Sequence, residues 1–192
     1  AFGFASFQNH NILKFNASAR INFGQNYLSY PNSKFNISKN KYPTLILGYE
    51  KGFGATNSDY NFDQIKARLY QSFTIGNKGR FGYNMRGGKF FNADAIVFMD
   101  FQHFNGNQIN VSQRGNYTDV FNNLGYYDLS TNDSYIEMHA EHDFNGYILG
   151  KIPLLNKLNF NLVVGAHHLA TANNKPYQEF TLGLDKMGWA KL

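Results

Sequence analysis

The feature that most constrains the fold of this chain is an alternation of apolar and polar residues with a period of two. From Leu13 to Phe23 every odd-numbered residue is apolar, while the even-numbered residues between them are polar or charged. The same alternation, with few exceptions, runs through residues 64–75, 80–86, 135–144, 158–167 and 179–185. Successive side chains of a β-strand point to opposite faces, so each segment is predicted to be a strand with one apolar and one polar face.

Weaker alternation brings the expected number of strands to about eight to ten. The weaker segments are residues 1–8, 42–53, 95–101 and 108–113. Residues 76–79, Gly-Asn-Lys-Gly, tolerate the positive φ angles of a tight turn, so the strands on either side are predicted to form an antiparallel hairpin. The one helical candidate is the connection 148–158, which Pro153 interrupts.

Strands with two different faces fit a soluble sandwich, a soluble barrel or a transmembrane barrel, and alternation alone does not separate them. Several segments keep the period for about 11 to 14 residues, longer than soluble strands and long enough to cross a bilayer at a tilt. Aromatic residues make up 17% of the chain and charged residues only 16%. Many aromatic residues lie near the expected strand ends, where membrane barrels carry aromatic girdles. These features favour an antiparallel transmembrane β-barrel.

Composition excludes several other classes of protein. The longest uninterrupted apolar run, Ala95 to Met99, is far shorter than the ~18 residues of a membrane-spanning helix. The chain has no cysteine, which excludes disulfides, thiolate metal sites and thiol nucleophiles. Its net charge of +5 comes from basic residues that do not cluster, so nucleic acid is not an expected partner.

The polar faces of the expected strands differ in the sign of their charge. Earlier strands carry basic residues and later strands carry acidic ones, so a closed barrel would allow the two groups to pair inside its lumen. Unpaired charge is costly where the dielectric constant is low. The predicted lumen charge network consists of Lys66, Arg68, Arg80, Arg86, Glu137, Glu141 and Asp143.

Two stretches, residues 99–108 and 130–146, resemble a family of uncharacterised outer-membrane proteins of the Bacteroidota. Residues 151–158 are similar to a short periplasmic connection of the same family. Its members carry a carboxypeptidase-regulatory-like domain ahead of a C-terminal barrel. The resemblance implies that residues 1–192 are one barrel segment, incomplete and part of a longer chain, in the bacterial outer membrane. Outer-membrane lipid and other envelope proteins are then the expected partners.

More distantly, the last third resembles the end of a BamA/TamA-type barrel, in which a strand with an inward Glu precedes the closing strands. Glu137 would be that residue. The lumen-loop motif of that superfamily is absent, and His103, Phe104, Asn105 and Gly106 occupy roughly its place. These four residues are a predicted lumen latch, reaching Arg68, Arg86 or Glu137, and the alternative is an ordinary external loop.

No catalytic, cofactor or metal site is predicted. His139 and Glu141 share one face of a strand while His142 points to the other, so the three cannot surround one ion. No nucleophile-elbow sequence accompanies the Ser and Asp residues. The expected function is a structural, transport or envelope-assembly role without catalysis. BamA/TamA-like protein insertion and a soluble glycan-binding sandwich remain as alternatives.

Overall fold

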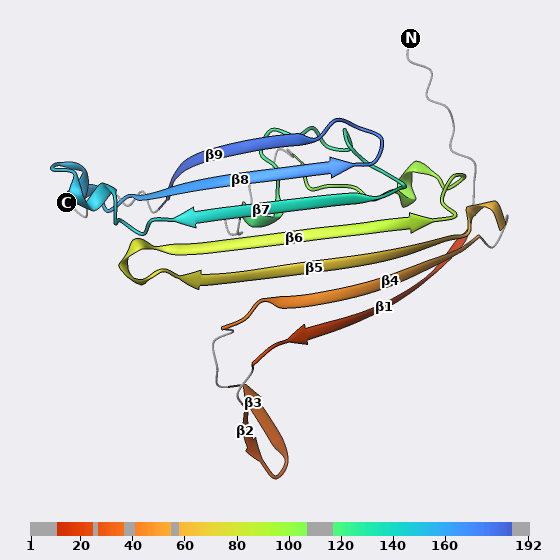
Figure 1. The fold of residues 1–192 in the computed structure, drawn as a ribbon, viewed down its shortest axis with the longest axis horizontal. Helices are drawn as coiled ribbons and strands as arrows, with labels where there is room; N and C mark the ends of the chain where they lie inside the picture. Colours follow the sequence, from red (N-terminus) through yellow and green to blue (C-terminus); the bar gives the residue numbers. More distant parts are fainter. Residues whose placement is uncertain (1–10, 25–26, 37–40, 55–57, 107–116, 186–192) are drawn as a thin grey trace.

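The computed structural model describes residues 11–24, 27–36, 41–54, 58–106 and 117–185, and these contain one main antiparallel sheet (Figure 1). Its strands follow one another in chain order, so each pairs with its sequence neighbours in the sheet. The seven strands are β1 (Ile12–Asn22), β4 (Thr44–Gly54), β5 (Phe62–Thr74), β6 (Arg80–Phe91), β7 (Tyr135–Asp143), β8 (Asn161–Thr171) and β9 (Tyr177–Asp185). Within the described ranges the sheet is open, with β1 at one edge and β9 at the other.

The all-β, antiparallel prediction is confirmed. The predicted hairpin around residues 76–79 is present, with Thr74 opposite Arg80 at the start of the β5–β6 register. The turn closes because Gly76 and Gly79 adopt positive φ angles of 50° and 112°. None of the helices in the described ranges is both long and apolar enough to cross a lipid bilayer.

Two further strands, β2 (Tyr27–Tyr30) and β3 (Ser33–Asn36), form a separate hairpin that projects beyond the β1 edge of the main sheet (Figure 1). It lies between β1 and β4, at the same end of the sheet as residues 75–79 and 144–160. We call this the hairpin end. The opposite end carries the connections 58–61, 92–134 and 172–176 in their described parts, and we call it the insert end.

The two faces of the main sheet follow the predicted alternation. One face, the apolar face, exposes side chains such as Phe180 and Leu182 of β9, which are 80% and 77% exposed. The other, the polar face, carries the side chains that are buried, including Glu137 and His139 of β7. The connection 92–134 folds back over the polar face, and this packing supplies the core.

Of the segments with weaker alternation, one is not a strand and two lie outside the described residues. Residues 95–101 were predicted as a strand and this is wrong: they form bends and a 3₁₀ turn at Phe98–Asp100. Their apolar character has another cause, because Ile96 packs in a buried cluster with Phe62 and Phe90. The segments 1–8 and 108–113 lie outside the described residues.

The helical candidate at 148–158 forms two short 3₁₀ helices, Leu149–Lys151 and Leu155–Leu158. Pro153 lies between them, where its missing N–H prevents one continuous helix.

Candidate functional site

The connection between β6 and β7, residues 92–134, is the element that builds a site on the polar face; we call it the inserted segment. Its two described parts run side by side. Gln102 and Thr131 exchange backbone hydrogen bonds of 2.8 and 3.1 Å, and the Phe121 amide donates to the Asn105 carbonyl at 2.8 Å. The two parts therefore support each other as they cross the sheet.

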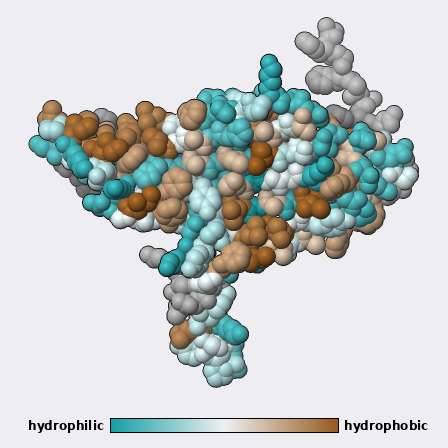
Figure 2. Space-filling view, viewed as in Figure 1, coloured by the Kyte–Doolittle hydropathy of each residue, from teal (hydrophilic) through white to brown (hydrophobic). Residues whose placement is uncertain are grey.

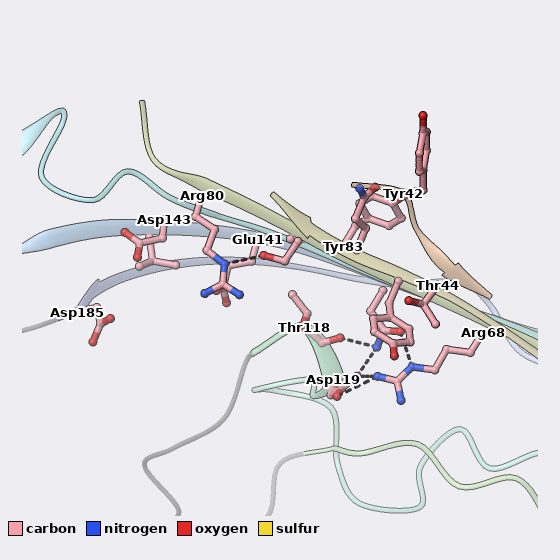
Figure 3. Close-up of a pocket in the computed structure, with 16 residues that line it drawn as sticks. Tyr42, Thr44, Arg68, Arg80, Tyr83, Thr118, Asp119, Glu141, Asp143 and Asp185 are labelled. Carbon is pink, nitrogen blue, oxygen red and sulfur yellow. Dashed lines mark hydrogen bonds and ion pairs between the residues drawn. The ribbon is translucent and has the colours of Figure 1, made fainter. Parts of the chain in front are cut away.

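Asp119 of the inserted segment binds two arginines of the sheet. It is the last residue of a short 3₁₀ turn, Tyr117–Asp119. Arg68 donates to its carboxylate at 3.0 Å (Figure 3). Arg86 donates to the same carboxylate at 2.5 Å. Asn84 donates to the same carboxylate and, at 2.8 Å, to the Thr118 carbonyl. One carboxylate thus compensates two neighbouring positive charges, Arg68 and Arg86, which face each other across β5 and β6.

A chain of polar contacts continues from Arg86 into the most buried part of the sheet. Arg86 lies 3.6 Å from the carboxylate of Glu137, whose side chain is 2% exposed. Glu137 accepts a hydrogen bond of 2.7 Å from Nε2 of His139. His139 and His167 meet through their Nδ1 atoms at 2.8 Å, and His167 Nε2 lies 3.3 Å from the Thr181 hydroxyl.

These contacts define the tautomers of both histidines. Because Glu137 accepts from His139 Nε2, the Nδ1 of a neutral His139 is an acceptor, and Nδ1–H of His167 donates to it. The Thr181 hydroxyl then donates to His167 Nε2. Two doubly protonated rings would place two N–H donors against each other, so this arrangement allows a second ring proton on at most one of the two histidines.

Glu179 of β9 holds the inserted segment from the other side. Its two carboxylate oxygens each accept a 2.8 Å hydrogen bond from a backbone amide, that of Asn122 and that of Asn123. The Tyr177 hydroxyl donates to the same carboxylate at 2.9 Å. These charge-assisted hydrogen bonds hold the backbone of residues 122–123 against β9.

Phe121 lies between the two carboxylate contacts and is fully buried. Its ring packs against the rings of His139, His167 and Tyr177, with centroids 4.6, 6.2 and 5.7 Å away. Burial of an aromatic side chain contributes about 1.5–3 kcal/mol. Hydrophobic packing therefore acts together with the two carboxylates to hold residues 119–123 against the sheet.

The structure brings together three members of the predicted charge network, Arg68, Arg86 and Glu137. Lys66 is elsewhere, in an ion pair of 2.6 Å with Glu50 of β4. Most of these contacts join adjacent strands or the inserted segment, whereas the prediction placed them across a lumen.

The other three members of the predicted network lie toward the hairpin end. Arg80 donates to the Ser72 hydroxyl at 2.6 Å, and Asp143 accepts from the Asn145 amide at 2.7 Å. Glu141 lines the same cleft as these two residues.

The predicted latch residues lie in the first described part of the inserted segment, and they contact the second part, which carries Asp119. Phe104 is buried against Tyr135, and Asn105 donates to the Asp119 carbonyl at 3.1 Å. His103 Nδ1 lies 2.8 Å from the Ser130 hydroxyl, and its ring contacts Tyr127. Burial lowers the pKa of His103 from its usual value. A Cβ on Gly106 would lie 2.5 Å from the Leu124 carbonyl, so only glycine fits there.

The contacts to Arg68 and Arg86 come from Asp119, while the predicted latch residues support the part of the inserted segment that carries Asp119.

A cleft of about 620 Å³ lies between Asp119 and the hairpin end of the polar face (Figure 3). Arg68, Asp119 and Thr118 form one side of it, and Arg80, Glu141, Asp143 and Asp185 form the other. Tyrosines 42, 70 and 83 complete its lining. The walls are therefore polar and carry both signs of charge.

In the described part of the chain, no group of three His, Asp or Glu side chains is arranged to hold a metal ion. His139 is buried on the polar face, whereas His142 contacts Phe81 and Phe144 on the apolar face. Each ring nitrogen of His139 and His167 has a partner within the protein, and together these contacts form a structural network.

Sequence reasoning missed Asp119, Asn84, His167 and Glu179 as members of this site. His167 and Glu179 carried a usable signal, because both are polar residues on the inward side of alternating strands. Asp119 carried none, since it lies in a non-periodic segment.

The sequence was also compared with known proteins. Residues 1–184 match the family described as "Family of unknown function (DUF5686) C-terminal domain". No curated protein and no solved structure matches the chain.

Proposed function

The chain belongs to the DUF5686 C-terminal domain family, and on that premise we propose that it is part of an outer-membrane β-barrel. The strands of the barrel would contact lipid through the apolar face and enclose the inserted segment on the polar face. Its role is structural, in transport or in envelope assembly, and it has no catalytic site. Its expected partners are outer-membrane lipid and other envelope proteins.

The observation that carries this proposal is the inverted burial of the two faces. Phe180, Leu182 and Ile65 on the apolar face are 80%, 77% and 53% exposed, while Glu137 and His139 on the polar face are 1% exposed. A protein in water minimises exposed apolar surface, and contiguous patches of it mark a contact with lipid or protein. Transmembrane barrels have this distribution, with an apolar exterior and a polar interior.

Aromatic residues at both ends of the apolar face support a membrane position. Phe73 and Phe81 pair near the hairpin end, and Phe53 and Phe91 lie near the insert end. Between them the strands carry mainly aliphatic side chains such as Leu47 and Ala67. Two aromatic bands that flank an aliphatic band are typical of the girdles of outer-membrane barrels.

Orientation follows from the connections. Barrels of this class have short periplasmic turns and long external loops. Residues 92–134 form the longest connection and lie at the insert end, which would face the exterior, while the tight turn at 76–79 would face the periplasm. The inserted segment would then enter the barrel from outside and close part of its lumen.

The test uses the full-length natural protein. An outer-membrane barrel partitions with the outer-membrane fraction, needs detergent for extraction and migrates faster on a gel when unboiled. A soluble sandwich is released without detergent and shows no mobility difference. Release into the soluble fraction would overturn the proposal.

A BamA/TamA-like insertion barrel is the second candidate, favoured by the two edges of the sheet. In the described part of the chain, β1 and β9 each have a strand partner on one side only, and both carry exposed apolar side chains. Free edges are templates for pairing with another strand. Depletion of the protein followed by a census of other outer-membrane proteins tests this role: a general loss supports insertion, and an unchanged census contradicts it.

A further inference from the structure

The hairpin β2–β3 has an apolar face that remains exposed. Its register places Leu28 opposite Phe35 and Tyr30 opposite Ser33, so Leu28, Tyr30 and Phe35 share one face. Their side chains are 44%, 54% and 56% exposed. A two-stranded hairpin is at best marginally stable in water unless its apolar face is packed. We therefore expect a partner to cover the apolar face of this hairpin.

The β7–β8 connection exposes a second apolar group at the same end of the sheet. Ile152, Leu154, Leu155 and Leu158 are all exposed, and hydrophobic side chains gather over this connection in Figure 2. Leu154 is 78% exposed and has a φ angle of 76°. A bulky side chain rarely adopts that backbone conformation, so the fold holds Leu154 outward at a conformational cost.

Lysines accompany both apolar groups. The described connections at the hairpin end contain five lysines and no acidic residue: Lys34, Lys41, Lys78, Lys151 and Lys157. The described connections at the insert end contain six aspartates and one lysine: Asp59, Asp94, Asp100, Asp119, Asp128, Asp133 and Lys175. Asp143 and Asp185 also lie at the hairpin end, but they close strands and line the cleft on the polar face.

We propose that the hairpin end is a binding surface for anionic phospholipid headgroups. The apolar side chains of hairpin β2–β3 and of the β7–β8 connection would enter the headgroup layer, and the lysines beside them would contact phosphate groups. This inference rests on the proposed function, because it needs the apolar face of the sheet to lie in the same bilayer.

Two features of the hairpin end favour lipid as the molecule that binds there: its connection to the apolar face and its positive charge. Phe73 and Phe81 pack together where the apolar face meets the hairpin end, and the His142 ring links Phe81 to Phe144 at the start of the lysine-bearing β7–β8 connection. Aromatic rings favour the membrane interface, and lysines extend their flexible chains to reach phosphates. Basic residues beside a membrane surface are attracted to anionic lipid. The described connections at the hairpin end contain lysines and no acidic residue, and this charge is complementary to that of anionic headgroups.

The experiment reconstitutes the full-length protein in phosphatidylcholine bilayers that contain a trace of spin-labelled lipid. Electron paramagnetic resonance then measures the fraction of immobilised lipid, first with phosphatidylglycerol and then with phosphatidylcholine as the label. The test variant is Lys34→Gln/Lys157→Gln, at two exposed lysines of the hairpin end. The control, Lys89→Gln/Lys175→Gln, removes the same charge from exposed positions toward the insert end.

We expect the wild-type protein to prefer phosphatidylglycerol by about fivefold for each lysine in contact with a headgroup. The test variant should lose roughly threefold or more of that preference, and the control should retain it. Equal immobilisation of the two lipids, or an equal loss in both variants, overturns the inference and leaves the proposed function intact. Absence of any immobilised lipid overturns the proposed function, and the inference with it.

Discussion

The two faces of the main sheet differ in both chemistry and surroundings. On the apolar face, Phe180 and Leu182 project with at least three quarters of their surface exposed. On the polar face, one or two strands away, Glu137, His139 and His167 are buried beneath the inserted segment. In water the usual preference is the reverse, since charged side chains are almost never fully buried unless paired. The comparison shows that specific partners organise the polar residues, whereas the large apolar side chains of Phe180 and Leu182 stay exposed.

The largest expected effect comes from Glu137 on the polar face. Glu137→Ala leaves Arg86 and His139 without their buried partner and should lower the free energy of unfolding by about 3–5 kcal/mol. Urea unfolding in lipid vesicles measures it. The control is Glu141→Ala, on the same face of the same strand and only half-buried, which should cost about 1 kcal/mol or less. Equal losses would mean that the buried network does not organise the polar face.

The apolar face is tested by placing a charge in the middle of β5. Leu69→Arg should lower the free energy of unfolding in lipid by about 2–4 kcal/mol, because arginine is costly near the bilayer midplane. Ile75→Arg, at the end of the strand, should cost about 0–1 kcal/mol because the interface tolerates charge. A loss that does not depend on the position along the strand would contradict a lipid environment.

Asp119 tests how the inserted segment is held on the polar face. Asp119→Asn leaves Arg68 and Arg86 without a carboxylate, and it should cost about 1–2 kcal/mol because these side chains are partly exposed to solvent. Limited proteolysis should then cleave within residues 117–124 faster than in the wild type. Asp128→Asn, an exposed change in the same segment, is the control. Unchanged proteolysis would show that Glu179 and Phe121 hold the inserted segment against the sheet without Asp119.

A smaller effect is expected at the predicted latch. The double variant His103→Ala/Asn105→Ala removes the Ser130 hydrogen bond and the contact with the Asp119 carbonyl. Each hydrogen bond contributes about 0.5 kcal/mol at these partly exposed positions, so the melting temperature should fall by a few degrees. Unchanged melting would reject a latch role for residues 103–106.

The smallest effect is a pH dependence in the inserted segment. The pKa of His103 is lowered by burial, so between that pKa and the usual value of 6.5 the unfolded chain binds a proton that the folded chain does not. Stability should therefore fall as the pH drops through 6.5, and the loss is complete below the folded-state pKa. Between about pH 7.5 and pH 5.5 the melting temperature of the wild-type protein should fall further than that of His103→Gln, by up to a few degrees. An identical change in both proteins would contradict this assignment.

Much of the sheet followed from periodicity. The β5–β6 hairpin, its turn at 76–79 and the face of each charged residue could be predicted, because side-chain direction in a strand is determined locally. The prediction of a strand at 95–101 was wrong because it interpreted apolar residues as one face of a strand. Ile96 is apolar because it packs in a buried cluster with Phe62. The candidate site was predicted only in part. Asp119 lies far along the chain from Arg68, and no local pattern marks that contact.

By itself the sequence determined which residues share a face, because strand geometry alternates side chains whatever surrounds the sheet. Only the tertiary structure decided which face is covered, since that depends on where residues 92–134 return across the strands. It also decided that Asp119 and Glu179 hold this segment, because these ionic and hydrogen-bonded contacts join residues that only the folded chain brings within 3 Å.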